Sequence, residues 1–249
     1  KHGRVAVWFG APSVKVLFDR IGRGWGDGAA KLQAIATKEI NPMSIRRRRQ
    51  RADQGDELDM QAVWRGDLSR AWTRTRRQAR AGANRAITIV CNLTASANVK
   101  ADTLFWRGAA ALKLADELTA SGYNVAIYAA TAQRDTATNA QVDSVQFVSI
   151  KDADQPLDLS ALAALTAMPG FFRTSMFAGI VTACDAVGQM YDSGLGYPDH
   201  DSIKPAMETL GLSTGGATFV QRRVDSKDDA EAWIDACLEQ IENPELAAA

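Results

Sequence analysis

The sequence lacks the features that mark several common classes of protein. Its cysteines are few and widely spaced, at Cys91, Cys184 and Cys237, which argues against a CxxC metal or redox motif and a disulfide framework. The formal net charge is zero, so overall charge gives no bias toward nucleic acid or anionic membranes. No apolar run approaches the ~20 residues of a membrane span. We therefore expect buried, reduced thiols and no membrane partner.

Signatures of catalysis are also missing. The sequence has no HExxH motif and no nucleophile elbow, and its Gly22-x-Gly24 stretch lacks the Gly-Lys-Ser/Thr ending of a P-loop. His200 stands between Asp199 and Asp201, but the chain contains only one other histidine. We expect an exposed loop histidine there rather than a metal ligand. The sequence therefore predicts a non-enzymatic protein.

One stretch shows the pattern of a strand–helix–strand unit. An apolar run over Ile87–Cys91 is followed by a polar loop over 92–98, an amphipathic helix over 101–120, Gly122 and a second apolar run over 124–130. Such a unit builds a parallel sheet with a right-handed crossover. The sequence predicts an α/β fold with a Rossmann-like open sheet, mostly parallel, and helices on both faces.

We expect two regions in the chain. Residues 85–249 form the α/β domain, and residues 1–84 form an N-terminal extension with a short strand near residues 5–9, helices, and basic and acidic runs. Because the chain begins at Lys1 without an initiator methionine, we expect further residues upstream. The remaining elements predicted in the domain are strands over 144–150 and 217–222 and helices over 157–167, 171–188, 203–210 and 228–242.

The loop after the first strand of this domain is the first candidate site, because ligands of open α/β sheets bind at the carboxyl ends of the strands. Asn92, Thr94 and Ser96 alternate along it. Amide and hydroxyl oxygens are hard ligands of the kind that suits Mg²⁺. The other interpretation is that these polar residues cap the helix that begins near Ala101.

This alternating pattern after an apolar strand resembles the metal-site motif Asp-x-Ser-x-Ser of von Willebrand factor A (vWA) domains. The resemblance covers roughly residues 85–241. In that family a threonine from a later loop and an aspartate from a third loop complete the site, and Thr174 lies about where the threonine is expected. Because Asn92 replaces the leading aspartate, the resemblance implies a degenerate metal site, with Mg²⁺ as the candidate ion. The candidates for the third-loop aspartate are Asp185 and Asp192.

A second stretch, Gly55-Asp-Glu-Leu-Asp59, is similar to a segment of bacterial vWA proteins that work with MoxR-type AAA+ ATPases. The combination of GWxxG, GDELD and WRGAAA stretches also resembles phage-encoded proteins. These resemblances imply a protein-interaction module with an AAA+ ATPase or a virion component as its partner, located in the cytoplasm or, alternatively, in a virion. The partner-binding edge would comprise Asn92, Thr94, Ser96, Asp102 and Thr174.

Arginines concentrate before the α/β domain and predict an alternative function. Basic residues beside an aromatic can contact phosphates and stack on bases, which would make the chain a nucleic-acid-associated protein. Two other interpretations remain. The adjacent acidic run over 53–59 could pair with the first arginines, and Leu68 and Trp72 could dock one face of an amphipathic helix that leaves arginines in solvent. The candidate nucleic-acid residues are Arg46, Arg47, Arg48, Arg49, Arg51, Arg70, Arg74, Arg76 and Arg77.

Overall fold

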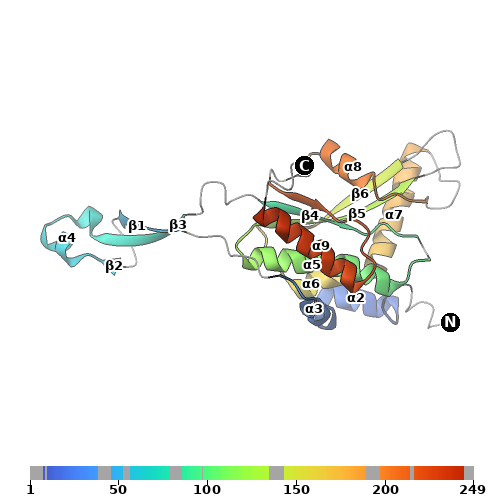
Figure 1. The fold of residues 1–249 in the computed structure, drawn as a ribbon, viewed down its shortest axis with the longest axis horizontal. Coiled ribbons are helices and arrows are strands. Elements are labelled where there is room, and N and C mark those ends of the chain that lie inside the picture. The colour runs from blue at the N-terminus through green and yellow to red at the C-terminus, as the bar shows by residue number, and fades with distance from the viewer. Residues whose placement is uncertain are drawn as a thin grey trace. The chain divides into compact units, whose positions relative to one another are not determined.

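The structure of the 249-residue chain is a computed structural model. It describes Trp8 and residues 10–38, 46–52, 57–78, 86–96, 98–134, 143–188, 197–213 and 216–243. The chain divides into two compact units, shown as ribbons in Figure 1: Lys1–Asn41 with Arg85–Ala249, and Pro42–Asn84. Apart from Trp8, the strand expected near residues 5–9 lies outside the described residues.

The first unit is a mixed α/β structure with a mostly parallel sheet. Its strand order is β6 (Asp143–Lys151), β5 (Val125–Arg134), β4 (Ile87–Asn92), β8 (Thr218–Val220). Strand β4 pairs in parallel with both β5 and β8, whereas β6 pairs antiparallel with β5. The short β7 (Tyr197–Pro198) also pairs antiparallel with β5. The predicted mostly parallel α/β sheet is therefore confirmed, with an antiparallel strand at one edge.

Alternating side chains along β4 face two hydrophobic layers of different size. Ile89 belongs to the larger core, beneath α5 (Ala101–Ala120) and α9 (Lys227–Glu242), and Val90 belongs to a smaller core beneath α8 (Ile203–Thr209). Figure 1 shows α5 and α9 on one side of the sheet and α8 on the other. Helices therefore cover both faces, as predicted.

Two consecutive helices follow β6 and contribute to the larger core. Helix α6 spans Leu159–Thr166, and the Asp158 carboxylate caps its first turn by accepting hydrogen bonds from backbone N–H groups. Helix α7 spans Pro169–Val187. A proline at the first helical position has no N–H to leave unpaired, so Pro169 marks the break between the two helices. Both predicted helices are confirmed with small shifts at their ends.

Helix α5 makes the crossover between β4 and β5, and its alanine- and leucine-rich sequence favours a helix. It packs unusually closely on the turn between α6 and α7. A Cβ atom on Gly108 would lie 2.3 Å from the carbonyl oxygen of Thr166 and 2.6 Å from the Cα of Ala167. A glycine is therefore required where α5 crosses this turn.

We expect Gly108→Ala to lower the free energy of unfolding by about 3 kcal/mol, because backbone atoms cannot move aside as a flexible side chain can. Gly22 provides a matched control, since a Cβ atom there would meet nothing within 4 Å. Gly22→Ala should raise the free energy of unfolding by about 0.5 kcal/mol. Urea unfolding of the two variants measures both effects, and equal stabilities would contradict the close packing of α5.

Helices α2 (Val14–Arg23) and α3 (Gly26–Gln33) also belong to the first unit. They pack on it because Leu17 and Leu32 are buried, and Trp25 meets Phe105 of α5 edge-on at 6.0 Å. The expected domain boundary at 84/85 coincides with the edge of the second unit. The described residues 10–38, which the sequence placed in the extension, lie instead on the α/β unit.

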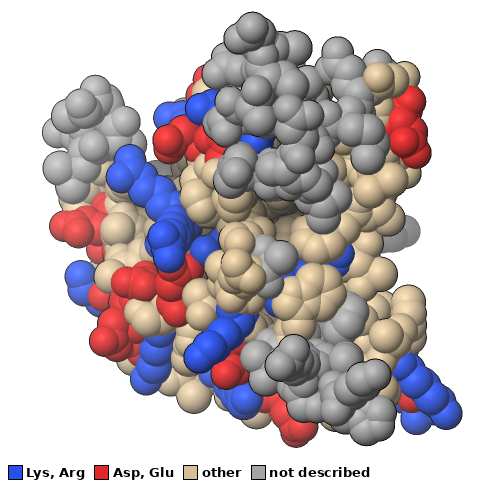
Figure 2. Space-filling view, turned by 90° about the vertical axis from the view of Figure 1, so that its right-hand side faces the viewer, with Lys and Arg blue, Asp and Glu red and all other residues tan. Residues whose placement is uncertain are grey.

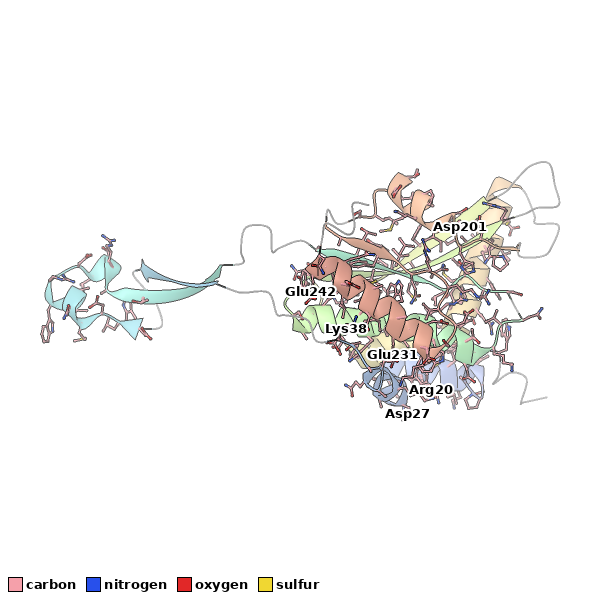
Figure 3. All side chains as sticks on the ribbon, viewed as in Figure 1. Arg20, Asp27, Lys38, Asp201, Glu231 and Glu242 are labelled. Carbon is pink, nitrogen blue, oxygen red and sulfur yellow. The ribbon has the colours of Figure 1, made fainter. Side chains whose placement is uncertain are left out.

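The segment after α3 runs against α9. The Glu231 carboxylate accepts a hydrogen bond from the backbone N–H of Ala36 at 3.0 Å, and Lys38 pairs with Asp235 at 3.8 Å. Figure 3 labels Lys38 and Glu231 beside this helix. These contacts hold the end of the N-terminal helical segment on the α/β unit.

The second unit contains a three-stranded sheet of order β1-β3-β2. Its elements are β1 (Arg46–Ala52), β2 (Glu57–Leu58), α4 (Met60–Trp64), the 3₁₀ helix η1 (Leu68–Arg70) and β3 (Trp72–Gln78).

The amphipathic helix considered for the second arginine-rich stretch is wrong, because residues 72–78 form a strand. Tryptophan and threonine at residues 72, 73 and 75 favour a strand. Strand β3 pairs with β1, for which the sequence analysis predicted only a basic run. Residues 79–85, where the helix was expected to continue, lie outside the described residues.

Within the described residues, no helix is both long and apolar enough to cross a membrane.

Candidate functional site

The carboxyl ends of β4 and β8 lie side by side, because the two strands are parallel and Val90 is the Cα partner of Val220. Figure 2 faces the side of the molecule on which these strand ends lie, and it shows basic and acidic side chains next to one another. This edge is where the sequence placed its first candidate site.

Asn92 and Thr94 are buried at this edge, with exposed fractions of 1% and 0%. The Asn92 side-chain oxygen accepts a hydrogen bond from the Thr94 backbone N–H at 3.0 Å. The Thr94 hydroxyl oxygen accepts one from the Ala132 backbone N–H at 2.9 Å, and so ties the loop to β5. Both side chains therefore fix the path of the loop.

A buried arginine of α5, Arg107, lies beneath the same loop with 2% exposure. Its guanidinium donates to the Thr94 carbonyl oxygen, to the Val224 carbonyl oxygen at 3.3 Å and to the Asp225 carboxylate at 2.7 Å. Five donors in a planar fork allow one arginine to join three acceptors from two segments. Arg107 therefore links the loop after β4 to the segment after β8.

Asp225 is the acidic partner of this arrangement, and it also accepts a hydrogen bond from Arg223. Burial alone would raise the pKa of the Asp225 carboxyl, but hydrogen bonds and positive charge from Arg107 and Arg223 lower it below its ordinary value. The carboxylate is therefore ionised at neutral pH, and two guanidinium groups balance its charge.

The other predicted site residues lie in separate segments. Ser96 is exposed, and its hydroxyl accepts a hydrogen bond from the Asn98 backbone N–H at 3.4 Å. Thr174 is exposed on α7 and donates to the Gly170 carbonyl oxygen at 2.7 Å. Asp102 lies in the first turn of α5 and lines a cavity of ≈ 440 Å³ with Trp25 and Trp106.

None of the four predicted metal ligands has a carboxylate, the group that most favours a divalent cation. The oxygens of Asn92, Thr94 and Thr174 are engaged in internal hydrogen bonds, and the adjacent carboxylate, Asp225, is already balanced by arginines. Among the described residues, no group of three or more His, Cys, Asp and Glu side chains could hold a metal ion.

Sequence reasoning missed both Arg107 and Asp225. A single arginine within the apolar stretch Leu104–Leu112 was the available signal for a buried charge, since a buried arginine requires acceptors. Asp225 lies in the segment after β8, a strand of only three residues that gives a weak signal in the sequence. Of the two aspartates considered instead, Asp185 is exposed near the end of α7 and Asp192 lies outside the described residues.

His200 is half-buried and contacts the loop after β4, which corrects the expectation of an exposed histidine. Its Nδ1 lies 3.0 Å from the Asn92 amide nitrogen. Because the amide oxygen already accepts from Thr94, the amide nitrogen is the donor and Nδ1 the acceptor. Nearby, Arg134 pairs with Asp199 at 2.6 Å, which fixes the segment that carries the histidine.

The pKa of His200 lies below its ordinary value of 6.5, first because of burial and then because of the positive charges of Arg107 and Arg223. The folded state therefore binds the His200 proton less readily than the unfolded state. We therefore expect the free energy of unfolding to fall as pH drops from 6.5 toward the lowered pKa of His200 in the folded state. Above pH 6.5 the histidine is neutral in both states, and this loss of stability is absent.

Urea unfolding between about pH 5 and 8 measures this effect, because that range spans the ordinary pKa of histidine. The matched variant is His200→Gln, which keeps an acceptor but cannot titrate. The wild-type protein should lose more stability than the variant on acidification. Identical pH profiles would contradict the assignment of a depressed histidine pKa.

The second unit contains an arginine-rich pair of strands, which we call the arginine ribbon and define as β1 and β3. Strand β1 contains five arginines, β3 contains three, and neither contains an acidic residue. In the antiparallel register, Arg47 is the Cα partner of Arg77 and Arg48 is the partner of Arg76. Like charges directly opposite each other destabilise a strand pair. The register therefore places two pairs of arginines at directly opposed positions of the ribbon.

Apolar side chains of the same unit are also exposed. Trp64 at the end of α4 is 82% exposed, and Leu68 of η1 is 64% exposed. Arg70, which was predicted as a nucleic-acid residue, is also exposed, at the end of η1. An exposed aromatic near arginines is an arrangement suited to stacking on nucleic-acid bases.

The fold and these two sites define a mixed α/β protein with a mostly parallel sheet and a separate arginine-rich β unit. The chain belongs to the family described as Domain of unknown function (DUF7192), whose family model matches residues 2–245. No curated protein and no solved structure matches the chain.

Proposed function

We propose that the chain is a non-enzymatic protein that binds nucleic acid through the arginine ribbon. The observation that carries this proposal is the register of β1 and β3, in which Arg47 faces Arg77 and Arg48 faces Arg76 with no acidic residue in either strand. Eight arginines in two paired strands offer a polyanion a dense row of positive charge. The phosphate backbone of a nucleic acid supplies closely spaced negative charge.

Two further properties favour nucleic acid as the polyanion. Guanidinium groups bind phosphate oxygens with two parallel hydrogen bonds, so arginine is better suited to phosphate than lysine. A two-stranded antiparallel ribbon has the dimensions that the major groove of B-DNA admits. The zero net charge of the chain does not oppose this proposal, because the positive charge is concentrated in one unit.

The test is a fluorescence-anisotropy titration of the full chain, at low salt, against labelled duplex DNA, duplex RNA and single-stranded DNA of equal length. We expect binding to at least one of the three in the micromolar range or tighter. As a control, the exposed Arg23 of α2 is replaced by glutamine. The control should bind with the same affinity as the wild type. If the wild-type chain binds none of the three nucleic acids, the proposal is overturned.

A second candidate function is a vWA-like protein-interaction module that binds through the carboxyl edge of the sheet. The observation that favours it is the pairing of β4 with both β5 and β8, which brings the ends of β4 and β8 together beside Arg107 and Asp225. The proposed partners are an AAA+ ATPase of the MoxR type or a virion component.

Ser96 offers a way to test this second function, because it is exposed and its hydroxyl makes one local hydrogen bond within the part of the chain that the structure describes. A pull-down with a purified MoxR-type ATPase should recover a stoichiometric complex with the wild-type chain. Ser96→Arg should abolish it without changing the melting temperature. No complex, or a complex indifferent to this substitution, would argue against binding at the edge.

A further inference from the structure

A cavity of ≈ 390 Å³ lies between α7 and the β5–β6 side of the sheet. Its wall is almost entirely apolar, and none of its lining residues is Asp, Glu, Lys, Arg or His. The volume falls within the range of small-molecule sites, ~300–1,000 Å³. The apolar lining residues that matter most here are Leu93, Ile150, Leu165, Phe172 and Met176.

One polar group in this wall lacks a hydrogen-bond partner among the described residues. The side-chain amide nitrogen of Gln146 is buried, and it makes no hydrogen bond with any described residue. An amide N–H removed from water without an acceptor is costly, so such groups are rare in folded proteins. Gln146 lies on β6, where its neighbours in the cavity wall are apolar.

Helix α7 makes room for this amide. Gly179 lies in the interior of α7, and a Cβ atom on it would come within 2.7 Å of the Gln146 side-chain oxygen. Glycine within a helix is unfavourable by about 1 kcal/mol relative to alanine. Two features that each cost free energy, a glycine within a helix and a buried amide nitrogen without an acceptor among the described residues, therefore occur together at the wall of one cavity.

We propose that this cavity binds a neutral, largely apolar small molecule with one hydrogen-bond acceptor, such as a carbonyl oxygen, to which the Gln146 amide nitrogen donates. The apolar wall gives the ligand its affinity, and the amide selects for the acceptor. A charged ligand is disfavoured because no side chain in the wall could compensate its lost hydration. The site lies in the α/β unit, and its proposal does not rest on nucleic-acid binding by the arginine ribbon.

The test uses the full chain with ¹³C-methyl-labelled methionine, so that the Met176 methyl group reports on the cavity by NMR. The probes are 2-heptanone, heptane and heptanoate, which share a similar chain but differ in the acceptor and the charge. We expect 2-heptanone to shift the Met176 signal and to bind roughly 3- to 10-fold more tightly than heptane, as a single hydrogen bond allows. Heptanoate should bind more weakly than 2-heptanone.

Two variants assign the binding to this cavity. Gln146→Leu should retain heptane binding but lose the preference for 2-heptanone, and Ser175→Trp, at the wall on α7, should block both probes. Equal affinities for 2-heptanone and heptane in the wild-type chain, or no shift of Met176 with either, would overturn the proposal.

The melting temperature of the ligand-free protein distinguishes an amide that serves ligand binding from one that stabilises the fold. Because the Gln146 amide has an unpaired donor, Gln146→Leu should raise the melting temperature by about 2–4 °C. Gln155→Leu is the matched control, since Gln155 is exposed in a turn outside the cavity, and it should change the melting temperature little. A fall in melting temperature for Gln146→Leu would show that the amide stabilises the fold and would contradict the proposal.

Discussion

Replacing Arg47, Arg48, Arg76 and Arg77 with glutamine is expected to weaken nucleic-acid binding by on the order of 100-fold at low salt. These residues form the two directly opposed arginine pairs of the arginine ribbon. Each substitution removes one positive charge that can contact a phosphate, and the dependence of affinity on salt should become shallower by about one unit per arginine removed.

The same substitutions should act in the opposite direction on stability. Removing two like-charged pairs from adjacent strands relieves repulsion, so the strand pair should become more stable. Hydrogen exchange of the backbone amides of β1 and β3 measures this, with slower exchange expected in the variant. Weaker binding together with a more stable ribbon would show that the arginines serve binding. Faster exchange would mean that the arginines stabilise the ribbon, and unchanged affinity would place binding elsewhere.

The second large effect is expected at the carboxyl edge of the sheet. Asp225→Ala should lower the free energy of unfolding by about 3 kcal/mol, because it leaves the buried Arg107 guanidinium without its carboxylate. Asp225 is itself partly exposed, so we expect the lower end of the range typical of broken buried pairs.

Asp185 provides the control for this loss. It is exposed near the end of α7, and Asp185→Ala should leave stability within about 0.5 kcal/mol of the wild type. Urea unfolding at neutral pH compares the two variants. If Asp225→Ala were as stable as Asp185→Ala, the Arg107–Asp225 pair would not hold the loop after β4 to the segment after β8.

The α/β unit could be predicted well from the sequence because its signals are local. The helix over 101–120 follows from an alanine- and leucine-rich stretch bounded by Gly122, and the break at Pro169 follows from its missing N–H group. Helices on both faces of the sheet could be predicted because the first strand is a continuous apolar run, as is typical of a strand buried on both sides. Each of these features depends on residues close together in the sequence.

The arginine ribbon could not be predicted because its pairing is non-local. Strands β1 and β3 are joined through β2, α4 and η1, and their arginines do not show the alternation of apolar and polar residues that marks a half-buried strand. The contact between His200 and Asn92 is similarly remote, as these residues lie 108 positions apart. Such pairings depend on the folded arrangement, which leaves no local pattern in the sequence.

The most direct test of nucleic-acid binding by this chain is the dependence of wild-type affinity on salt concentration. If the arginine ribbon contacts the phosphate backbone, the logarithm of the association constant should fall linearly with the logarithm of salt concentration, with a slope of about −4 or steeper. The wild-type chain and the variant with Arg47, Arg48, Arg76 and Arg77 replaced should differ in this slope. A flat salt dependence, or equal slopes for both proteins, would contradict nucleic-acid binding through the ribbon.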